Sequence, residues 1–203
     1  MKKNTDDTSK HRNAFDNPEN FVEKFDGAKR DEWQKPDEVI RTFNLPDDAV
    51  VVEIGSGTGY FAVRLAEQVK NGKVIAFDQS ANMVSYLEDR VSELGLNNID
   101  AHTTEPDGSI ALEEKADLIF SVDVYHHMQD RISYFSNLAS HLKPEGKLVI
   151  IDRTEEEVEG QPSGHRIPVE KVKEEMKEAG FELVEELDFL LPIQYYLTFK
   201  PNR

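Results

Sequence analysis

Apolar positions along the chain follow two patterns, short continuous runs and residues three or four apart. Apolar runs end at Ile54, at Phe77 and at Val122, and they are rich in β-branched and aromatic residues, as buried parallel strands are. Between and after these runs, apolar residues recur at helical spacing in residues 61–69, 84–94 and 132–142. The alternation predicts an α/β fold with a doubly wound, mostly parallel sheet between two helical layers.

Weaker patterns complete the predicted sheet. A third strand is expected in residues 97–102, and a fifth in residues 147–152 after a turn at Lys143-Pro144-Glu145-Gly146. A helix is expected over residues 167–179. Residues 181–187 and 195–199 then read as two strands without a helix between them, which predicts an antiparallel last strand.

The N-terminal residues divide into two parts. Residues 1–13 are polar and without periodicity, which predicts a mobile tail. Residues 14–36 carry Phe15, Phe21, Phe25 and Trp33 among many charges, too many aromatics for a solvated linker. They form either a helical cover over the ligand site or a layer packed on the side of the sheet. A helix follows at residues 37–43. We expect a single domain over residues 14–203, with 14–36 as the cover and 37–203 as the core.

A glycine-rich turn follows the first strand. Gly55, Gly57 and Gly59 allow positive φ and a close approach of the backbone to a ligand, and the next helix directs its free N–H groups toward that ligand. A dinucleotide site would require Gly-x-Gly-x-x-Gly. Here the spacing is Gly-x-Gly-x-Gly, with the acid Glu53 two residues ahead. A purely structural glycine turn is the alternative.

The second strand ends in Asp78. A carboxylate in this position can accept both hydroxyls of a ribose, because its two oxygens offer several lone pairs. Alternatively, Asp78 or Ser80 caps the next helix. Both interpretations can hold together, since Ser80 suits the cap.

Four polar residues follow the fourth strand, where open α/β sheets bind ligands. They are Asp123, Tyr125, His126 and His127. Histidine titrates nearest neutrality and can deprotonate an acceptor, whereas the plainer interpretation places one His in the core or at a helix cap. Two adjacent histidines are not a recognisable ligand set, so no metal site is predicted.

Composition narrows the classes of partner. The chain has 203 residues and a net charge of −16, which disfavours nucleic acid and anionic membrane surfaces. There is no cysteine, and hence no disulfide, thiolate metal site or Cys nucleophile. We expect no signal peptide and no membrane span, because no apolar segment is long enough, and the default location is the cytoplasm.

The segment Glu53-x-Gly55-x-Gly57-x-Gly59 resembles the first motif of class I S-adenosylmethionine-dependent methyltransferases. Residues 117–152 are similar to small-molecule methyltransferases of the ubiquinone and menaquinone biosynthesis type, through His126, His127, Met128, Asp130, Lys143, Pro144 and Gly146. The resemblance implies a Rossmann-like fold and S-adenosylmethionine as cofactor. It implies these cofactor-binding residues: Glu53, Gly55, Ser56, Gly57, Gly59, Asp78, Gln79, Met83, Thr104, Glu105 and Val122.

The resemblance therefore predicts a methyltransferase that acts on a small molecule by in-line displacement, with His126, His127 and Tyr125 as catalytic candidates. Two alternatives stay open: a nicotinamide-dependent oxidoreductase, and a module that binds the methyl donor without catalysis. The accepting atom, the use of a general base and the choice between monomer and homodimer are also left open.

Overall fold

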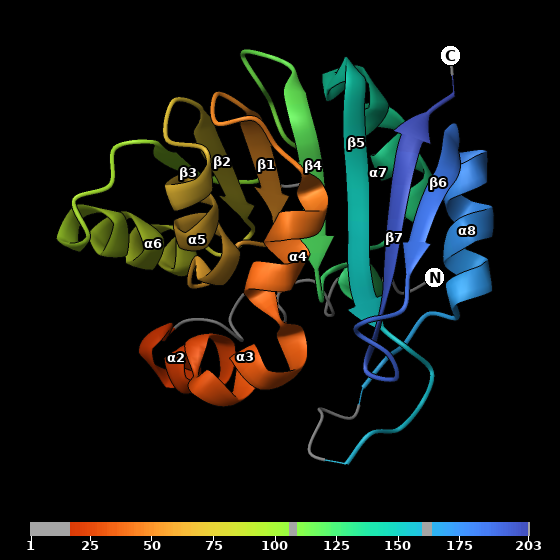
Figure 1. The fold of residues 1–203 in the computed structure, drawn as a ribbon, viewed down its shortest axis with the longest axis horizontal. Helices are drawn as coiled ribbons and strands as arrows, with labels where there is room; N and C mark the ends of the chain where they lie inside the picture. Colours follow the sequence, from red (N-terminus) through yellow and green to blue (C-terminus); the bar gives the residue numbers. More distant parts are fainter. Residues whose placement is uncertain (1–16, 106–108, 160–163, 203) are drawn as a thin grey trace, which may run out of the picture.

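A computed structural model describes residues 17–105, 109–159 and 164–202 of the chain (Figure 1). The predicted mobile tail, residues 1–13, lies outside the described residues, as does Phe15. Within the described ranges, no helix combines the length and the apolar content that crossing a membrane requires.

Seven strands form one sheet in the order β3-β2-β1-β4-β5-β7-β6. Their bounds are β1 Val50–Ile54, β2 Lys73–Asp78, β3 Ile99–Thr103, β4 Ala116–Val122, β5 Leu142–Arg153, β6 Phe181–Leu187 and β7 Gln194–Pro201. All neighbours pair in parallel except β7, which runs antiparallel to both β5 and β6. The predicted antiparallel last strand is confirmed, and this ending differs from the parallel six-stranded order of dinucleotide-binding folds.

Helices cover both faces of the sheet (Figure 1). One face carries α4 Pro36–Phe43, α5 Tyr60–Gln68 and α6 Ala81–Glu93, and the other carries α7 Arg131–Leu138 and α8 Val169–Glu178. The core is accordingly divided into two clusters, one around Phe61 and Leu65 of α5 and one around Phe135 of α7 and Met176 of α8. The predicted three-layer α/β sandwich is confirmed.

The turn predicted at Lys143–Gly146 is wrong, because these residues lie inside β5. Leu142 already pairs with Ala116, and the register then shifts before Leu118 pairs with Lys147. The irregularity takes up the extra residues on the β5 side, as a bulge does, and accommodates a proline that cannot donate to the ladder. Pro144 and Gly146, which usually end a helix or a strand, therefore lie at an irregularity within β5 and do not mark where the strand begins.

Two further helices, α2 Glu19–Asp26 and α3 Ala28–Gln34, lie at the carboxyl ends of β1 and β2 (Figure 1). This is the end of the sheet where open α/β folds bind ligands, and the role of these helices as a cover over a ligand stays a prediction. The ring of Phe25 at the end of α2 is the nearest atom group to the open side of Gly57. We call α2 and α3 together the cover.

Candidate active site

The glycine loop after β1 is shaped by backbone conformations that favour glycine. Gly57 has φ +54° and Gly59 has φ +85°. A Cβ on Gly59 would lie 2.3 Å from the Leu87 side chain, whereas a Cβ on Gly57 would meet only the Phe25 ring, at 3.8 Å. Gly59 therefore serves helix packing, while Gly57 leaves its open side toward the cover.

Asp78 joins the glycine loop to the start of α6. Its Oδ2 accepts the Gly57 N–H at 2.8 Å, and its Oδ1 accepts the Ser80 N–H at 2.9 Å. Ser80 caps α6, since its Oγ accepts the Met83 N–H at 3.4 Å. Burial raises the pKa of Asp78, and the N–H groups of Ser80, Gly57 and Gln79 oppose that rise. Ser80 thus takes the cap and leaves Asp78 beside the loop.

Glu53 is almost fully buried near the end of β1, with 3% of its surface exposed. Its Oε2 has no hydrogen-bond partner among the described residues. Burial raises the pKa of Glu53 to about 8; Arg30 and the Ala62 N–H lower it, while Asp78 and Asp26 add to the rise. An unpaired buried carboxyl group is costly, and such groups cluster at functional sites.

The remaining predicted cofactor residues fall into two groups. Thr104 and Ser56 are both bonded to the end of β2. The Thr104 N–H donates to the Asp78 carbonyl at 3.0 Å, and the Ser56 N–H donates to the Phe77 carbonyl at 3.0 Å. Gln79 and Glu105 are exposed, whereas Met83 and Val122 are buried. The structure brings residues 53–59, 78–80 and 104 together at the carboxyl ends of β1 and β2.

His126 is held by an acid that the sequence analysis did not single out. Its Nδ1 lies 2.7 Å from Oδ1 of Asp152 at the end of β5, and its backbone N–H donates to Oδ2 at 3.1 Å. The two side chains are 2% and 1% exposed. His127 is exposed, and its ring centroid lies 3.9 Å from that of His126. The two histidines thus have different surroundings, one locked and one facing solvent.

Tyr125 is fully buried on the α7 and α8 side of the sheet. Its hydroxyl lies 2.5 Å from Glu175 of α8, which also pairs with Arg131 at 2.7 Å. Its ring stacks on Phe135 at 5.4 Å between centroids. Burial, followed by the contact with Glu175, raises the pKa of Tyr125. These contacts give Tyr125 a place in the core.

A chain of polar contacts crosses from the cover to the end of β4. Gln34 of α3 donates to Oε1 of Gln194 at 2.7 Å, and Gln194 donates to Oδ1 of Asp123 at 2.9 Å. Asp123 has φ +58°, and its Oδ1 lies 3.5 Å from Nε of Arg153. Gln34 and Gln194 are 160 residues apart, so no local pattern could have paired them. Asp152 had one signal, an acid at the end of a strand.

A small cavity adjoins this series of polar contacts at the carboxyl ends of β4 and β5. Its walls are Trp33, Asp123, Arg153, Glu156, Val158, Arg166, Ile193 and Gln194. One wall comes from the cover and the others from the sheet and its loops, so the cavity is closed only by tertiary structure.

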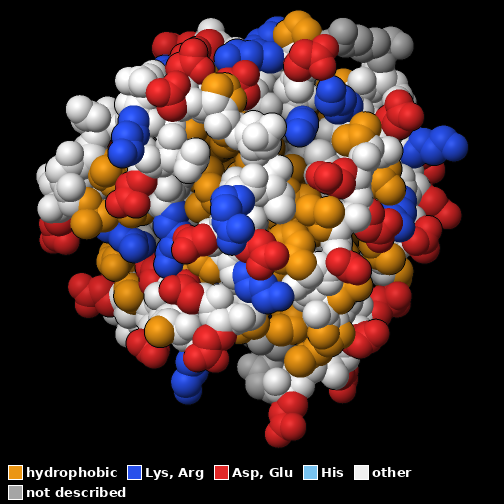
Figure 2. All heavy atoms as spheres, viewed as in Figure 1, with side chains coloured by type: hydrophobic (Ala, Val, Ile, Leu, Met, Phe, Trp, Pro, Cys, Tyr) orange, Lys and Arg blue, Asp and Glu red, His pale blue; other side chains and the backbone are white. Residues whose placement is uncertain are grey.

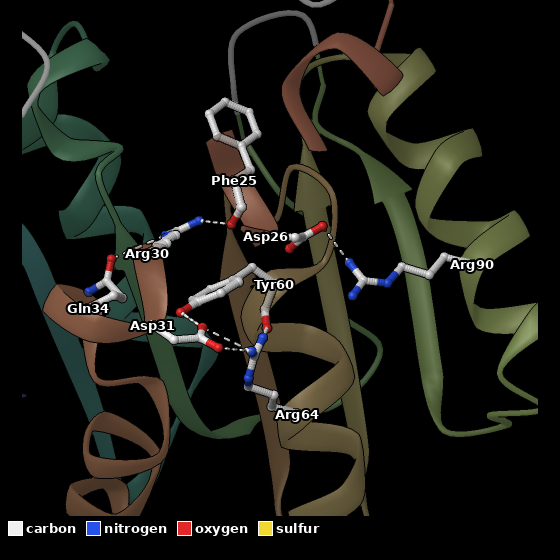
Figure 3. A network of polar contacts seen from close by, with 8 residues as sticks. All are labelled: Phe25, Asp26, Arg30, Asp31, Gln34, Tyr60, Arg64 and Arg90. Carbon is white, nitrogen blue, oxygen red and sulfur yellow. Dashed lines mark hydrogen bonds and ion pairs between the residues drawn. The ribbon is translucent and has the colours of Figure 1, made fainter. Parts of the chain in front are cut away.

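The cover is tied to the site by charged groups (Figure 3). Arg90 of α6 contacts Asp26 of α2 and the Thr58 carbonyl of the glycine loop, both at 2.8 Å. Asp31 of α3 accepts the Tyr60 hydroxyl at 2.5 Å and pairs with Arg64 at 3.1 Å. Charged contacts therefore supply much of the attachment of the cover.

Residues 28–186 match a family model described as a methyltransferase domain. The chain belongs to this methyltransferase domain family. A relative of the domain is malonyl-[acyl-carrier protein] O-methyltransferase 2 of Ilyobacter polytropus, 31% identical over 102 residues, covering 49% of this chain and 37% of the relative. Phosphoethanolamine N-methyltransferase 1 of Arabidopsis thaliana is 28% identical over 151 residues, covering 72% of this chain and 28% of the relative. The chain thus spans well under half the length of these relatives.

Among solved structures, a SAM-dependent methyltransferase from Aquifex aeolicus superposes with a TM-score of 0.82 at 26% identity, covering 90% of this chain and 97% of that one. The family match and this structure confirm the predicted cofactor class, S-adenosylmethionine, over the dinucleotide alternative. The methyltransferase domain also fits that cofactor in its own residues. It offers an open glycine at Gly57, an acid at Asp78, and an unpaired buried oxygen on Glu53.

Proposed function

We propose that the chain is an S-adenosylmethionine-dependent methyltransferase acting on a small-molecule acceptor at the carboxyl ends of β1, β2 and β4. The observation that carries the proposal is Asp78, held between the Gly57 and Ser80 N–H groups in a domain of the methyltransferase family. S-adenosylmethionine would supply, when bound, a methyl group on a positively charged sulfur. The acceptor's lone pair would form the new bond to the methyl carbon, and the sulfur would leave with the C–S bonding electrons.

In this proposal the protein mainly positions the reactants. Gly57 admits the cofactor close to the backbone, and Asp78 accepts hydrogen bonds from its ribose. The cover, which includes Trp33, excludes water from the carboxyl ends of the strands. Proximity and orientation together contribute on the order of 7–11 kcal/mol to such reactions, so a dedicated base is required only for a protonated acceptor.

Where a base is needed, His126 is the candidate. In the tautomer with hydrogen on Nδ1, that N–H donates to Asp152, so Nε2 carries the free lone pair. Asp152 would then stabilise the imidazolium that forms on proton transfer. His127 is exposed to solvent. Tyr125 is assigned a structural role, because its hydroxyl donates to Glu175.

The small-molecule class of the acceptor is supported by relatives named for small acceptors, phosphoethanolamine among them. A cytoplasmic location remains a prediction from the sequence alone. Methyl transfer rather than donor binding without catalysis would be demonstrated by a methylated product in an acceptor screen with labelled cofactor.

Calorimetric titration with S-adenosylhomocysteine tests the proposal, with reduced dinucleotides as controls. We expect micromolar binding of S-adenosylhomocysteine alone. Asp78→Asn should weaken it by about 1–3 kcal/mol, because a charged acceptor becomes a neutral amide. Asp100→Asn, the same change at an exposed position of β3, is the matched control and should bind as the wild type does. Equal affinity of Asp78→Asn and wild type would remove Asp78 from the site, and binding of a dinucleotide would overturn the function.

A further inference from the structure

Arg30 is a cationic side chain of the cover, and it lies beside Tyr60, the residue that follows the glycine loop (Figure 3). Its guanidinium packs on the Tyr60 ring, with 4.0 Å between Cζ and the ring centroid, at the start of α5. The acids that attract it come from three elements around the site: Asp123 after β4, Glu53 of β1 and Asp26 of α2. Arg30 is therefore placed between the glycine loop and the end of β4.

Only part of the guanidinium is used within the protein. Nη1 donates to the Phe25 carbonyl at 2.8 Å and Nη2 donates to Oε1 of Gln34 at 3.3 Å. The Nε atom is inaccessible to solvent and has no hydrogen-bond partner among the described residues. A guanidinium carries five N–H donors in a planar fork suited to carboxylates. An unused, desolvated N–H of this fork is a binding capacity that the fold alone does not satisfy.

Glu53 has a hydrogen-bond acceptor that is unpaired within the described part of the chain, as Arg30 has an unpaired donor. Its Oε2 is also buried without a partner among the described residues, and Glu53 and Arg30 influence one another electrostatically. An unused cationic donor and an unused acid oxygen at one end of the sheet suit a ligand that carries both charges. An α-amino acid group, with a carboxylate and an ammonium on adjacent atoms, is such a ligand.

We propose that Arg30 binds the carboxylate of the amino-acid portion of the cofactor, so that the cover recognises this end of the ligand. Glu53 then faces the ammonium of the same portion. The inference rests on the proposed function. It makes Arg30 a specificity residue: ligands that contain the nucleoside but lack the carboxylate lose this contact. Gln34 and Tyr60 serve to hold the guanidinium in place.

The test is a cycle of two proteins and three ligands, measured by calorimetry. The ligands are S-adenosylhomocysteine, its decarboxylated analogue 5′-(3-aminopropylthio)adenosine, and 5′-methylthioadenosine, which lacks the whole amino-acid portion. For wild type, we expect removal of the carboxylate to weaken binding at least tenfold. For Arg30→Met, S-adenosylhomocysteine should bind at least tenfold more weakly than to wild type, whereas the two ligands without a carboxylate should bind within about twofold of wild type.

Arg41→Met is the matched control, since Arg41 is exposed on α4 and its Nε donates to the Asp37 carbonyl of the same helix. It should leave all three affinities unchanged. Equal weakening of all three ligands by Arg30→Met would assign Arg30 to holding the cover and overturn the inference, as would an unchanged affinity for S-adenosylhomocysteine. The ligand comparison on wild type decides the matter even if Arg30→Met fails to fold: equal affinities with and without the carboxylate overturn it. If wild type binds none of the three ligands, the proposed function fails and the inference falls with it.

Discussion

At the scale of single residues, the site is marked by buried groups that the fold leaves unsatisfied. Glu53 is the clearest case, a carboxyl group with one oxygen unpaired among the described residues and a pKa raised to about 8, mainly by burial. Retaining such a group lowers the stability of the folded state whenever the unfolded chain can ionise it. A cost of this kind is common at positions that serve a ligand rather than the fold.

Glu53→Gln should consequently stabilise the protein in a pH-dependent way. The ordinary pKa is 4.5 and the folded value is about 8, so below pH 4.5 both states hold the proton and wild type carries no penalty. As pH rises toward 8 the free energy of unfolding falls, by up to about 1.4 kcal/mol per pH unit, and it then levels off. Urea denaturation at pH 5, 6.5 and 8 should show the advantage of the variant growing by at least about 2 kcal/mol.

The control for this experiment is Glu182→Gln, which removes the same charge from an exposed position of β6. Its stability difference from wild type should stay constant over the same pH range. Parallel profiles for wild type and Glu53→Gln would mean that Glu53 is ionised in the folded protein and would contradict the raised pKa.

At the scale of elements, the cover differs from the other helices in how it is attached. In α2 no residue is buried, and in α3 only Gln34 is. The contacts are instead ion pairs and hydrogen bonds, through Asp26, Arg30, Asp31 and Gln34. Partly exposed pairs of this kind contribute little each, so local opening of the cover should require much less free energy than global unfolding.

Ligand binding should therefore stabilise the cover. With saturating S-adenosylhomocysteine, amide hydrogen exchange in residues 19–34 should slow at least tenfold, because a ligand that binds only the closed arrangement shifts the opening equilibrium. Exchange in α8, on the far side of the sheet, serves as the internal reference and should not change. Protection limited to residues 55–59, with residues 19–34 unaffected, would show that the cover takes no part in binding.

At the scale of the whole molecule, the dominant feature is the net charge of −16. Acidic and basic side chains are interspersed over the face shown in Figure 2. The ion pairs of the described residues are mostly partly exposed, for example Lys73 with Glu114 at 2.7 Å and Lys200 with Glu145 at 3.0 Å. Pairs of this kind offset little of the long-range repulsion among the excess carboxylates.

Salt should thus raise thermal stability. Between about 10 mM and about 300 mM sodium chloride the Debye length shortens from roughly 30 Å to below 8 Å, which screens repulsion across the molecule. We expect Tm, measured by differential scanning fluorimetry, to rise by several degrees. Choline chloride at equal ionic strength should give the same rise if screening is the cause. A fall in Tm would mean that attractive pairs outweigh the net repulsion.

Local sequence was sufficient for most of the elements and for the local geometry of the candidate site after β1 and β2. The strand at Val50–Ile54, the glycine loop, the acid at Asp78 and the cap at Ser80 follow from neighbours in sequence, since φ preference, capping and strand burial act over a few residues. The parallel pairing of the first five strands and the antiparallel final strand followed from the same alternation, whereas the order of the strands came from the structure. The irregularity at Lys143–Gly146 did not, because pairing with β4 overrides the local preference for a turn.

Only the tertiary structure decided which distant residues share the site. The hydrogen bonds of Asp152 with His126 and of Gln34 with Gln194 join elements that are far apart in the sequence. Arg30 of α3 and Glu53 of β1 interact electrostatically across elements as well. No periodicity encodes them, because a hydrogen bond between side chains of different elements depends on the register and packing of both. The sequence by itself therefore determined the fold class, the cofactor class and the conformation of the glycine loop after β1, whereas the contacts of the cover and the partner of His126 depend on how the layers pack.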